Sequence, residues 1–232
     1  MKAIQYAVLA CAAVFSAACS KDQDDESFAP IETTAVKVMH AAPFSKFPIR
    51  ALLGGAELDV LAYGQRSRSY LLKPVADGLL ALQNAATQAY VFRVAQPVHK
   101  DTAYSVFVYN PTAFTVAAVV TTDFPRPAAG ANRALIRLAN FGFDAGAVTL
   151  TAQEAGASPL VPAVGYGAVG PFVAVDARAY ALDVRNASGV VLASSNLPAA
   201  ADGVYTVLVR GRNSSAAPAD EQLTVEVIKN EE

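Results

Sequence analysis

The stretch Asp101-Thr102-Ala103-Tyr104-Ser105-Val106-Phe107-Val108 decides the fold, because it recurs 101 residues later as Asp202-Gly203-Val204-Tyr205-Thr206-Val207-Leu208-Val209. Both stretches mix β-branched and aromatic residues, a composition that favours a β-strand. The same tyrosine stands in the same place in each. A strand repeated in this way indicates two copies of one β module.

Two further landmarks extend the repeat on the N-terminal side. Ala35-Val36-Lys37-Val38-Met39-His40 is answered by Ala134-Leu135-Ile136-Arg137-Leu138-Ala139-Asn140, and Leu61-Ala62-Tyr63-Gly64 by Val164-Gly165-Tyr166-Gly167, at offsets of 100 and 103 residues. Three landmarks in one order at nearly constant spacing indicate a duplication. We therefore expect copy one at 35–122 and copy two at 132–232.

The link between the copies is expected at 123–131, where Pro125 and Pro127 disfavour a helix. A link of this kind permits hinge motion unless the copies share an apolar interface.

Each copy is predicted to consist of seven or eight short strands. Segments such as Val36-Lys37-Val38 and Leu223-Thr224-Val225-Glu226-Val227 alternate apolar with polar residues, as in strands with one solvent-exposed face. Turn signals such as Gly54-Gly55 and Ser188-Gly189 separate these segments. The predicted fold class is all-β, with two tandem antiparallel sandwiches.

The N-terminal residues have a different composition. Ala3 to Ala18 form an apolar run behind Lys2 that is shorter than the roughly 20 residues of a membrane span. This run ends on small residues and leads into Cys19, and the next residues, 20–26, are mostly acidic. The pattern predicts a signal peptide at 1–18, followed by an acidic linker that extends to residue 34.

This N-terminal segment resembles the signal of bacterial lipoproteins, in which the cysteine after the small residues receives a lipid. The resemblance implies lipidation at Cys19 and attachment to the outer membrane. Cys11 also follows a leucine and an alanine, but it would leave only Ala3 to Ala10 as the apolar core. The acidic tract resembles that of surface-exposed lipoproteins of the Bacteroidota, which implies display on the outer face of the cell.

The repeated landmarks resemble the domain of unknown function 4397. In copy one the resemblance rests on His40-Ala41-Ala42-Pro43, on Ala62-Tyr63-Gly64 and on the strand around Tyr104; copy two keeps Tyr166-Gly167 and Tyr205-Thr206-Val207 but opens with Asn140. The family is found in exported bacterial proteins. The resemblance implies an immunoglobulin-like or transthyretin-like sandwich and no activity.

The sequence offers no assembled catalytic constellation. It contains only two histidines and two cysteines, and it has neither an HExxH nor a GxSxG motif. The GxGxxG string at 165–170 is followed by an apparent strand instead of the helix that a dinucleotide site requires. We therefore expect no enzyme activity, no cofactor and no metal.

Charge differs between the two copies. Residues 35–122 hold eight Lys or Arg against four acids, whereas residues 132–232 hold seven against ten. Because the two copies nearly cancel, nucleic acid is not an expected partner.

The best candidate binding residues are Tyr63, Arg66, Arg68 and Tyr70, since arginines beside aromatic rings can hold carboxylates, phosphates or sugars. The alternative is that Arg66 and Arg68 lie on the solvent side of an edge strand and discourage aggregation.

Three classes of function remain open from the sequence. The first is a non-enzymatic, lipid-anchored envelope protein that binds or scaffolds glycan, peptide or another envelope protein. The second is an accessory glycan-binding lipoprotein of a nutrient-uptake system, and the third is an enzyme with an unrecognised site.

Overall fold

The computed structural model describes residues 32–74 and 78–230, and its regular elements there are all β-strands. The all-β prediction is therefore confirmed for this part of the chain. The signal peptide, Cys19 and the acidic tract lie outside the described residues. Among those described, no helix has the length and apolar character that a membrane span requires.

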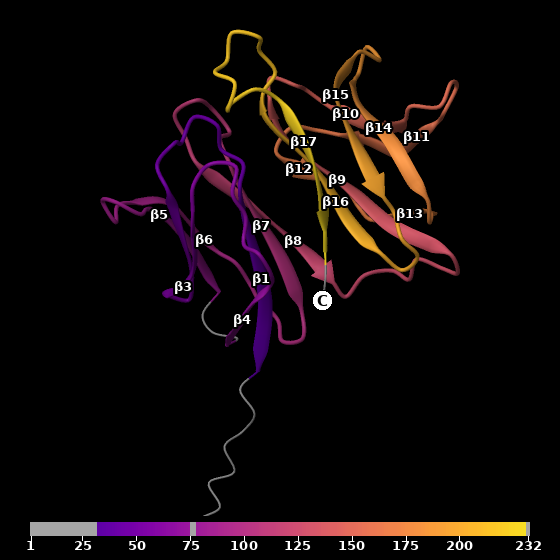
Figure 1. Cartoon of the computed structure of the whole chain (residues 1–232). Helices are drawn as coiled ribbons and strands as arrows, with labels where there is room; N and C mark the ends of the chain where they lie inside the picture. Colours follow the sequence, from indigo (N-terminus) through magenta and orange to yellow (C-terminus); the bar gives the residue numbers. More distant parts are fainter. Residues whose placement is uncertain (1–31, 75–77, 231–232) are drawn as a thin grey trace, which may run out of the picture. The chain divides into compact units, whose positions relative to one another are not determined.

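The strands fall into two consecutive sets (Figure 1). The first set comprises Thr33–His40 (β1), Ile49–Leu53 (β2), Ala56–Leu61 (β3), Leu71–Pro74 (β4), Leu79–Asn84 (β5), Tyr90–Ala95 (β6), Ala103–Tyr109 (β7) and Ala117–Phe124 (β8). The second comprises Arg133–Phe143 (β9), Val148–Ala152 (β10), Pro159–Val164 (β11), Ala168–Val169 (β12), Val173–Asp176 (β13), Ala179–Asn186 (β14), Val191–Pro198 (β15), Val204–Arg212 (β16) and Thr224–Lys229 (β17).

Each set builds two sheets of the same order. In the first set the orders are β4-β1-β7-β8 and β3-β2-β5-β6; in the second they are β12-β9-β16-β17, where β13 also pairs with β9, and β11-β10-β14-β15. The second set thus repeats the connectivity of the first, strand for strand, apart from the split of β4 into β12 and β13. The topology agrees with the repeat inferred from the sequence.

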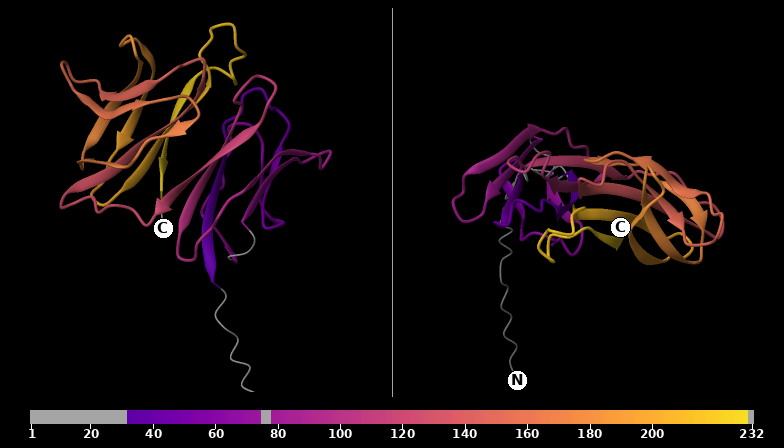
Figure 2. Two further views of the ribbon diagram at one scale, coloured as in Figure 1. Left: turned by 180° about the vertical axis from the view of Figure 1, so that it is seen from behind. Right: turned by 90° about the horizontal axis from the view of Figure 1, so that it is seen from above.

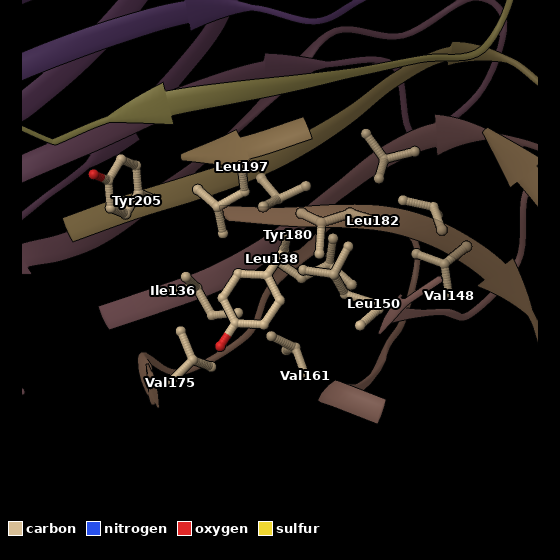
Figure 3. Close-up of a cluster of buried hydrophobic side chains, with 14 of the residues drawn as sticks. Ile136, Leu138, Val148, Leu150, Val161, Val175, Tyr180, Leu182, Leu197 and Tyr205 are labelled. Carbon is tan, nitrogen blue, oxygen red and sulfur yellow. The ribbon is translucent and has the colours of Figure 1, made fainter. Parts of the chain in front are cut away.

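The two sheets of each set enclose one hydrophobic core. In the first set, Val36 and Val106 from one sheet pack with Ile49 and Leu82 from the other. Figure 3 shows the second core, where side chains such as Ile136, Leu150 and Leu182 converge from both sheets. Two sheets that bury facing apolar surfaces are typical of β-sandwiches.

One detail of the expectation was wrong, because the sheets are not purely antiparallel. β1 pairs with β7 in parallel, with Val36 opposite Tyr104, and β9 pairs with β16 in parallel, with Ile136 opposite Tyr205. Figures 1 and 2 show the indigo strand β1 beside the magenta strand β7. Parallel pairs tend to be buried on both faces, which is the case here.

The prediction that β1 has one solvent-exposed face was also wrong. Its outward residues Lys37 and Met39 are buried, because the outer face of this sheet packs against the outer face of the equivalent sheet. Strand β9 is likewise buried along almost its whole length. An alternating sequence shows which residues share a face, but it does not show what covers that face.

The two repeated tyrosines occupy equivalent corners. The hydroxyl of Tyr104 accepts a hydrogen bond from the backbone N–H of His99 at 3.2 Å, and that of Tyr205 accepts one from the N–H of Ala200 at 3.1 Å. Tyr205 also donates to the carbonyl of Pro198. These tyrosines fix the entry to β7 and β16.

Candidate functional site

The surface shared by the two strand sets contains most of the side chains that the sequence marked as chemically interesting. We call it the inter-repeat interface and define it by the cluster of Met39, Ala41, Phe107, Ala139, Phe141, Leu208 and Ile228. The rings of Phe107 on β7 and Phe141 on β9 stack with centroids 5.0 Å apart. The link between the repeats is therefore not a free hinge, since they share an apolar interface.

A buried ion pair crosses this interface beside the apolar cluster. The guanidinium of Arg137 on β9 contacts the carboxylate of Asp123 near the end of β8, and each side chain is only 1% exposed. The Nε of Arg137 donates to the hydroxyl of Thr206 at 2.9 Å, and one of its terminal nitrogens donates to the carbonyl of Thr122 at 3.3 Å. Both charged groups are thus hydrogen-bonded, as buried charges must be to be tolerated.

Tyr70 belongs to the same network. Its hydroxyl donates to Asp123, which also accepts from the hydroxyl of Ser105 at 2.5 Å. Burial, followed by the negative charge of Asp123, raises the pKa of Tyr70. The Nζ atom of Lys37 lies 4.8 Å from the centroid of the Tyr70 ring. Tyr70 therefore acts as a fixed hydrogen-bond donor to a structural carboxylate.

Two other candidate residues also contact the second repeat. Arg66 forms an ion pair with Glu226 of β17. The guanidinium of Arg210 from β16 lies 5.5 Å from the centroid of the Tyr63 ring. Tyr63 and Arg66 thus contribute to the inter-repeat interface.

Lys46 forms further ion pairs across the interface. Lys46 of the first repeat lies 2.7 Å from Glu221 and 3.4 Å from Asp220 of the second. The ammonium of Lys46, and after it the guanidinium of Arg212, hold the pKa of Glu221 below its usual range. Lys46 and Arg66 are thus two cations of the first repeat that face acids of the second.

His40 has a local structural role that its counterpart shares. Its Nδ1 accepts a hydrogen bond from the N–H of Ala42, and the side-chain oxygen of Asn140 accepts one from the N–H of Gly142, both at 3.3 Å. Burial lowers the pKa of His40 to about 4, against a smaller opposing effect of the backbone of Phe47 and Ser45. Both residues fix the exit of a strand.

The side chain of Arg68 is exposed, as is that of Arg66, whereas Tyr63 and Tyr70 are partly buried. Arg68 lines an open cavity of about 530 Å³ between the start of β1, the segment before and within β4, and the ends of β8 and β17. Tyr70 also lines this cavity, so the structure brings Arg68 and Tyr70 together there while Tyr63 and Arg66 lie elsewhere on the interface. We call it the β1–β4 cavity.

Asp123 and Arg137 were not recognised as important from the sequence. Asp123 falls in the stretch expected to be a linker, although β8 continues to Phe124. Arg137 is the one charged residue within an otherwise apolar run from Ala134 to Ala139. A lone charge in a strand buried on both faces is the signal that points to such a pair.

No group of three or more His, Cys, Asp or Glu side chains suited to a metal ion occurs among residues 32–74 and 78–230. The cysteine for which lipidation was predicted, Cys19, lies outside these ranges, so the structure does not describe its surroundings.

Neither a protein-family model nor a curated protein matches the chain. Among solved structures, it is similar to CBMbc, a family CBM26 module of Amy13K from Eubacterium rectale, crystallised in complex with maltoheptaose. The identity is 10%, the match covers 82% of this chain and 100% of that chain, and the TM-score is 0.25. A TM-score of this size does not establish a common fold, so the ligand of that module carries no argument for this chain.

Proposed function

We propose that the chain is a non-enzymatic, lipid-anchored protein of the cell envelope. In this proposal its two sandwiches, of immunoglobulin-like or transthyretin-like type, form one body that binds or scaffolds at the outer membrane. The inter-repeat interface is the observation that supports it best. Phe107, Phe141 and the pair of Asp123 with Arg137 hold the repeats together, so that surfaces of both are presented in fixed register.

The same interface supports a non-enzymatic role. Tyr70 and Asp123 bond to each other within a buried network, and His40 bonds to its own strand exit. Asp123 and His40 are buried, and Tyr70, which also lines the β1–β4 cavity, is held there by its bond to Asp123, so these contacts stabilise the fold.

The proposed anchor is a lipid on Cys19, with the mature chain starting there. Metabolic labelling with a palmitate analogue tests it, with Cys19→Ala as the decisive variant and Cys11→Ala as the matched control. We expect label on the wild type and on Cys11→Ala, and none on Cys19→Ala. Label that persists on Cys19→Ala, or an unlabelled wild type, would contradict the anchor.

The proposed partners are a glycan or another envelope protein, and not nucleic acid. Charges that face each other across the interface, such as Lys46 with Glu221 and Arg66 with Glu226, compensate one another and leave no broad basic surface from these pairs. Protease treatment of intact cells shows whether the folded part lies on the outer face or in the periplasm.

A second candidate is an accessory glycan-binding role in nutrient uptake. It is favoured by Tyr90 on β6, a residue that is 53% exposed and whose ring centroid lies 4.4 Å from the guanidinium of Arg93. Exposed aromatic rings provide a flat apolar face for a sugar. A glycan array with wild type and Tyr90→Ala tests this role, and retention of the same glycans by both proteins would exclude Tyr90 as the platform.

A further inference from the structure

The β1–β4 cavity combines exposed apolar surface with positive charge, and nothing above assigns it a ligand. The start of β1, β4 and the end of β8 contribute Thr33, Leu72 and Phe124 to its lining. Its volume of about 530 Å³ falls within the range of small-molecule sites, roughly 300–1,000 Å³.

The apolar part of the lining is unusually exposed. Leu72 is 71% exposed and Phe124 is 41% exposed, and both line the cavity together with Ala35 and Ala103. Full burial of a leucine or phenylalanine side chain stabilises by about 1.5–3 kcal/mol relative to exposure. A ligand that covers these side chains would gain part of that free energy, and aliphatic lining of this kind suits an alkyl chain.

The polar part of the lining is cationic. Lys37, Arg68 and Lys229 contribute three positive charges, against the single carboxylate of Asp101. Lys37 is 4% exposed and its Nζ lies 4.8 Å from the centroid of the Tyr70 ring, whereas Arg68 is exposed. Cations at two depths favour an anionic group, because hydrogen bonds between charged partners are stronger than neutral ones.

We propose that the β1–β4 cavity binds an acyl chain that carries an anionic group, a carboxylate or a phosphate. The alkyl chain lies against Leu72 and Phe124, and the anionic group lies near Arg68 and Lys37. A neutral sugar fits less well, because the lining offers no Asn or Gln side chain and only one carboxylate.

The position of the cavity in the chain agrees with an amphiphilic ligand. Thr33, the first residue of β1, lines the cavity, and Cys19 precedes it by 14 residues. A chain of that length spans at most about 50 Å. The argument from position rests on the proposed lipid anchor, which would keep the cavity within reach of acidic lipids. The argument from the charge and apolar surface of the cavity does not depend on the anchor.

Titration calorimetry on the polypeptide 20–232 tests the proposal, since residues 31–232 form a compact unit. The probes are decyl phosphate and decanoate, with decyl maltoside and inorganic phosphate as comparisons, all below micelle formation. We expect both anionic amphiphiles to bind at least tenfold more tightly than decyl maltoside, and inorganic phosphate to give no measurable binding.

Two variants separate the contribution of the positive charge from that of the apolar surface. Arg68→Glu should weaken decyl phosphate at least tenfold and leave decyl maltoside unchanged, whereas Leu72→Asp should weaken both. Arg178→Glu, at an exposed arginine between β13 and β14, is the matched control and should change neither. Because all three side chains are exposed, the variants should keep the thermal midpoint of the wild type.

Three results would overturn the proposal: no binding of either anionic amphiphile, equal binding of inorganic phosphate, or Arg68→Glu without effect. None of them bears on the lipid anchor, because palmitate labelling of Cys19 is measured separately. Conversely, an unlabelled Cys19 alongside tight binding of decyl phosphate would leave the cavity assigned and remove the anchor.

Discussion

Arg137 and Asp123 form an ion pair that joins the two repeats at a depth where each side chain is 1% exposed. Arg137 occupies the position in β9 that Lys37 occupies in β1, and its partner Thr206 is the counterpart of Ser105. Equivalent positions of the two copies therefore meet at one interface. The duplication has provided both halves of a contact surface that neither copy could cover alone.

Removal of one member of this pair should be strongly destabilising. Arg137→Met leaves the carboxylate of Asp123 buried without its main partner, which costs about 3–5 kcal/mol. The double variant with Asp123→Leu should lose less than the sum of the single variants, because no uncompensated charge remains. Urea unfolding measures both.

The matched control is Arg178→Met, which breaks the exposed pair with Glu154. Its free energy of unfolding should stay close to that of the wild type, because exposed pairs contribute little. An Arg137→Met variant as stable as Arg178→Met would show that the buried pair does not hold the repeats together.

The stacked rings of the interface should also be coupled. Phe141 is fully buried, so Phe141→Ala should cost about 3–5 kcal/mol, and a double-mutant cycle with Phe107→Ala should give a coupling free energy of about 0.5–1.5 kcal/mol. Phe114→Ala, at a side chain that is 96% exposed, is the control and should change stability by less than about 0.5 kcal/mol. Strict additivity of the two core substitutions would argue against the stacking.

The turn at Gly167 should not tolerate a side chain. Its φ is +72°, and an added Cβ would lie 2.9 Å from the Tyr109 ring of the first repeat. Gly167→Ala should therefore cost more than Gly189→Ala, where φ is +79° but no atom lies within 4 Å. The difference, about 1–3 kcal/mol, isolates the close approach of the two repeats, and equal costs would contradict it.

Low pH should reduce the free energy of unfolding because of the lowered pKa of His40. Its pKa is about 4 in the folded chain, below the ordinary value of 6.5. Above pH 6.5 the ring is neutral in both states. As the pH falls towards 4, the unfolded chain binds a proton that the folded chain does not, so stability falls by about 3 kcal/mol.

The test compares urea unfolding of the wild type and His40→Asn between pH 7 and pH 4. Asn is the residue that occupies the equivalent position in the second repeat, Asn140. The variant should lose about 3 kcal/mol less over this range than the wild type. Parallel curves for the two proteins would mean that His40 does not remain neutral in the fold.

The sequence contained enough information for the strands and the repeat. Alignment of Val36 with Ile136 and of Tyr104 with Tyr205 matches the register of the structure, where Val36 faces Tyr104 and Ile136 faces Tyr205. This agreement arises because β-branched residues, turn glycines and corner tyrosines are local signals.

The features that could not be predicted from the sequence depend on contacts between residues far apart in the chain. Lys37 looked like a solvent-facing residue of an alternating strand, yet it and its counterpart Arg137 are buried, because the outer faces of two equivalent sheets pack together. For the same reason Arg66 looked like a ligand contact or an edge charge, whereas it pairs with Glu226, 160 residues away in the chain. Arg66 remains 41% exposed in this pair, and Arg68 is exposed as well.

Native-state hydrogen exchange on β5 and β14 tests most directly whether the repeats form one body. In each repeat, this strand lies in the middle of the sheet that does not form the inter-repeat interface. The account predicts the same opening free energy and the same denaturant dependence for both strands, and an equal loss in both when Phe107 is changed to Ala. Separate opening free energies, with a loss confined to β5, would show that the repeats are independent and would contradict the account.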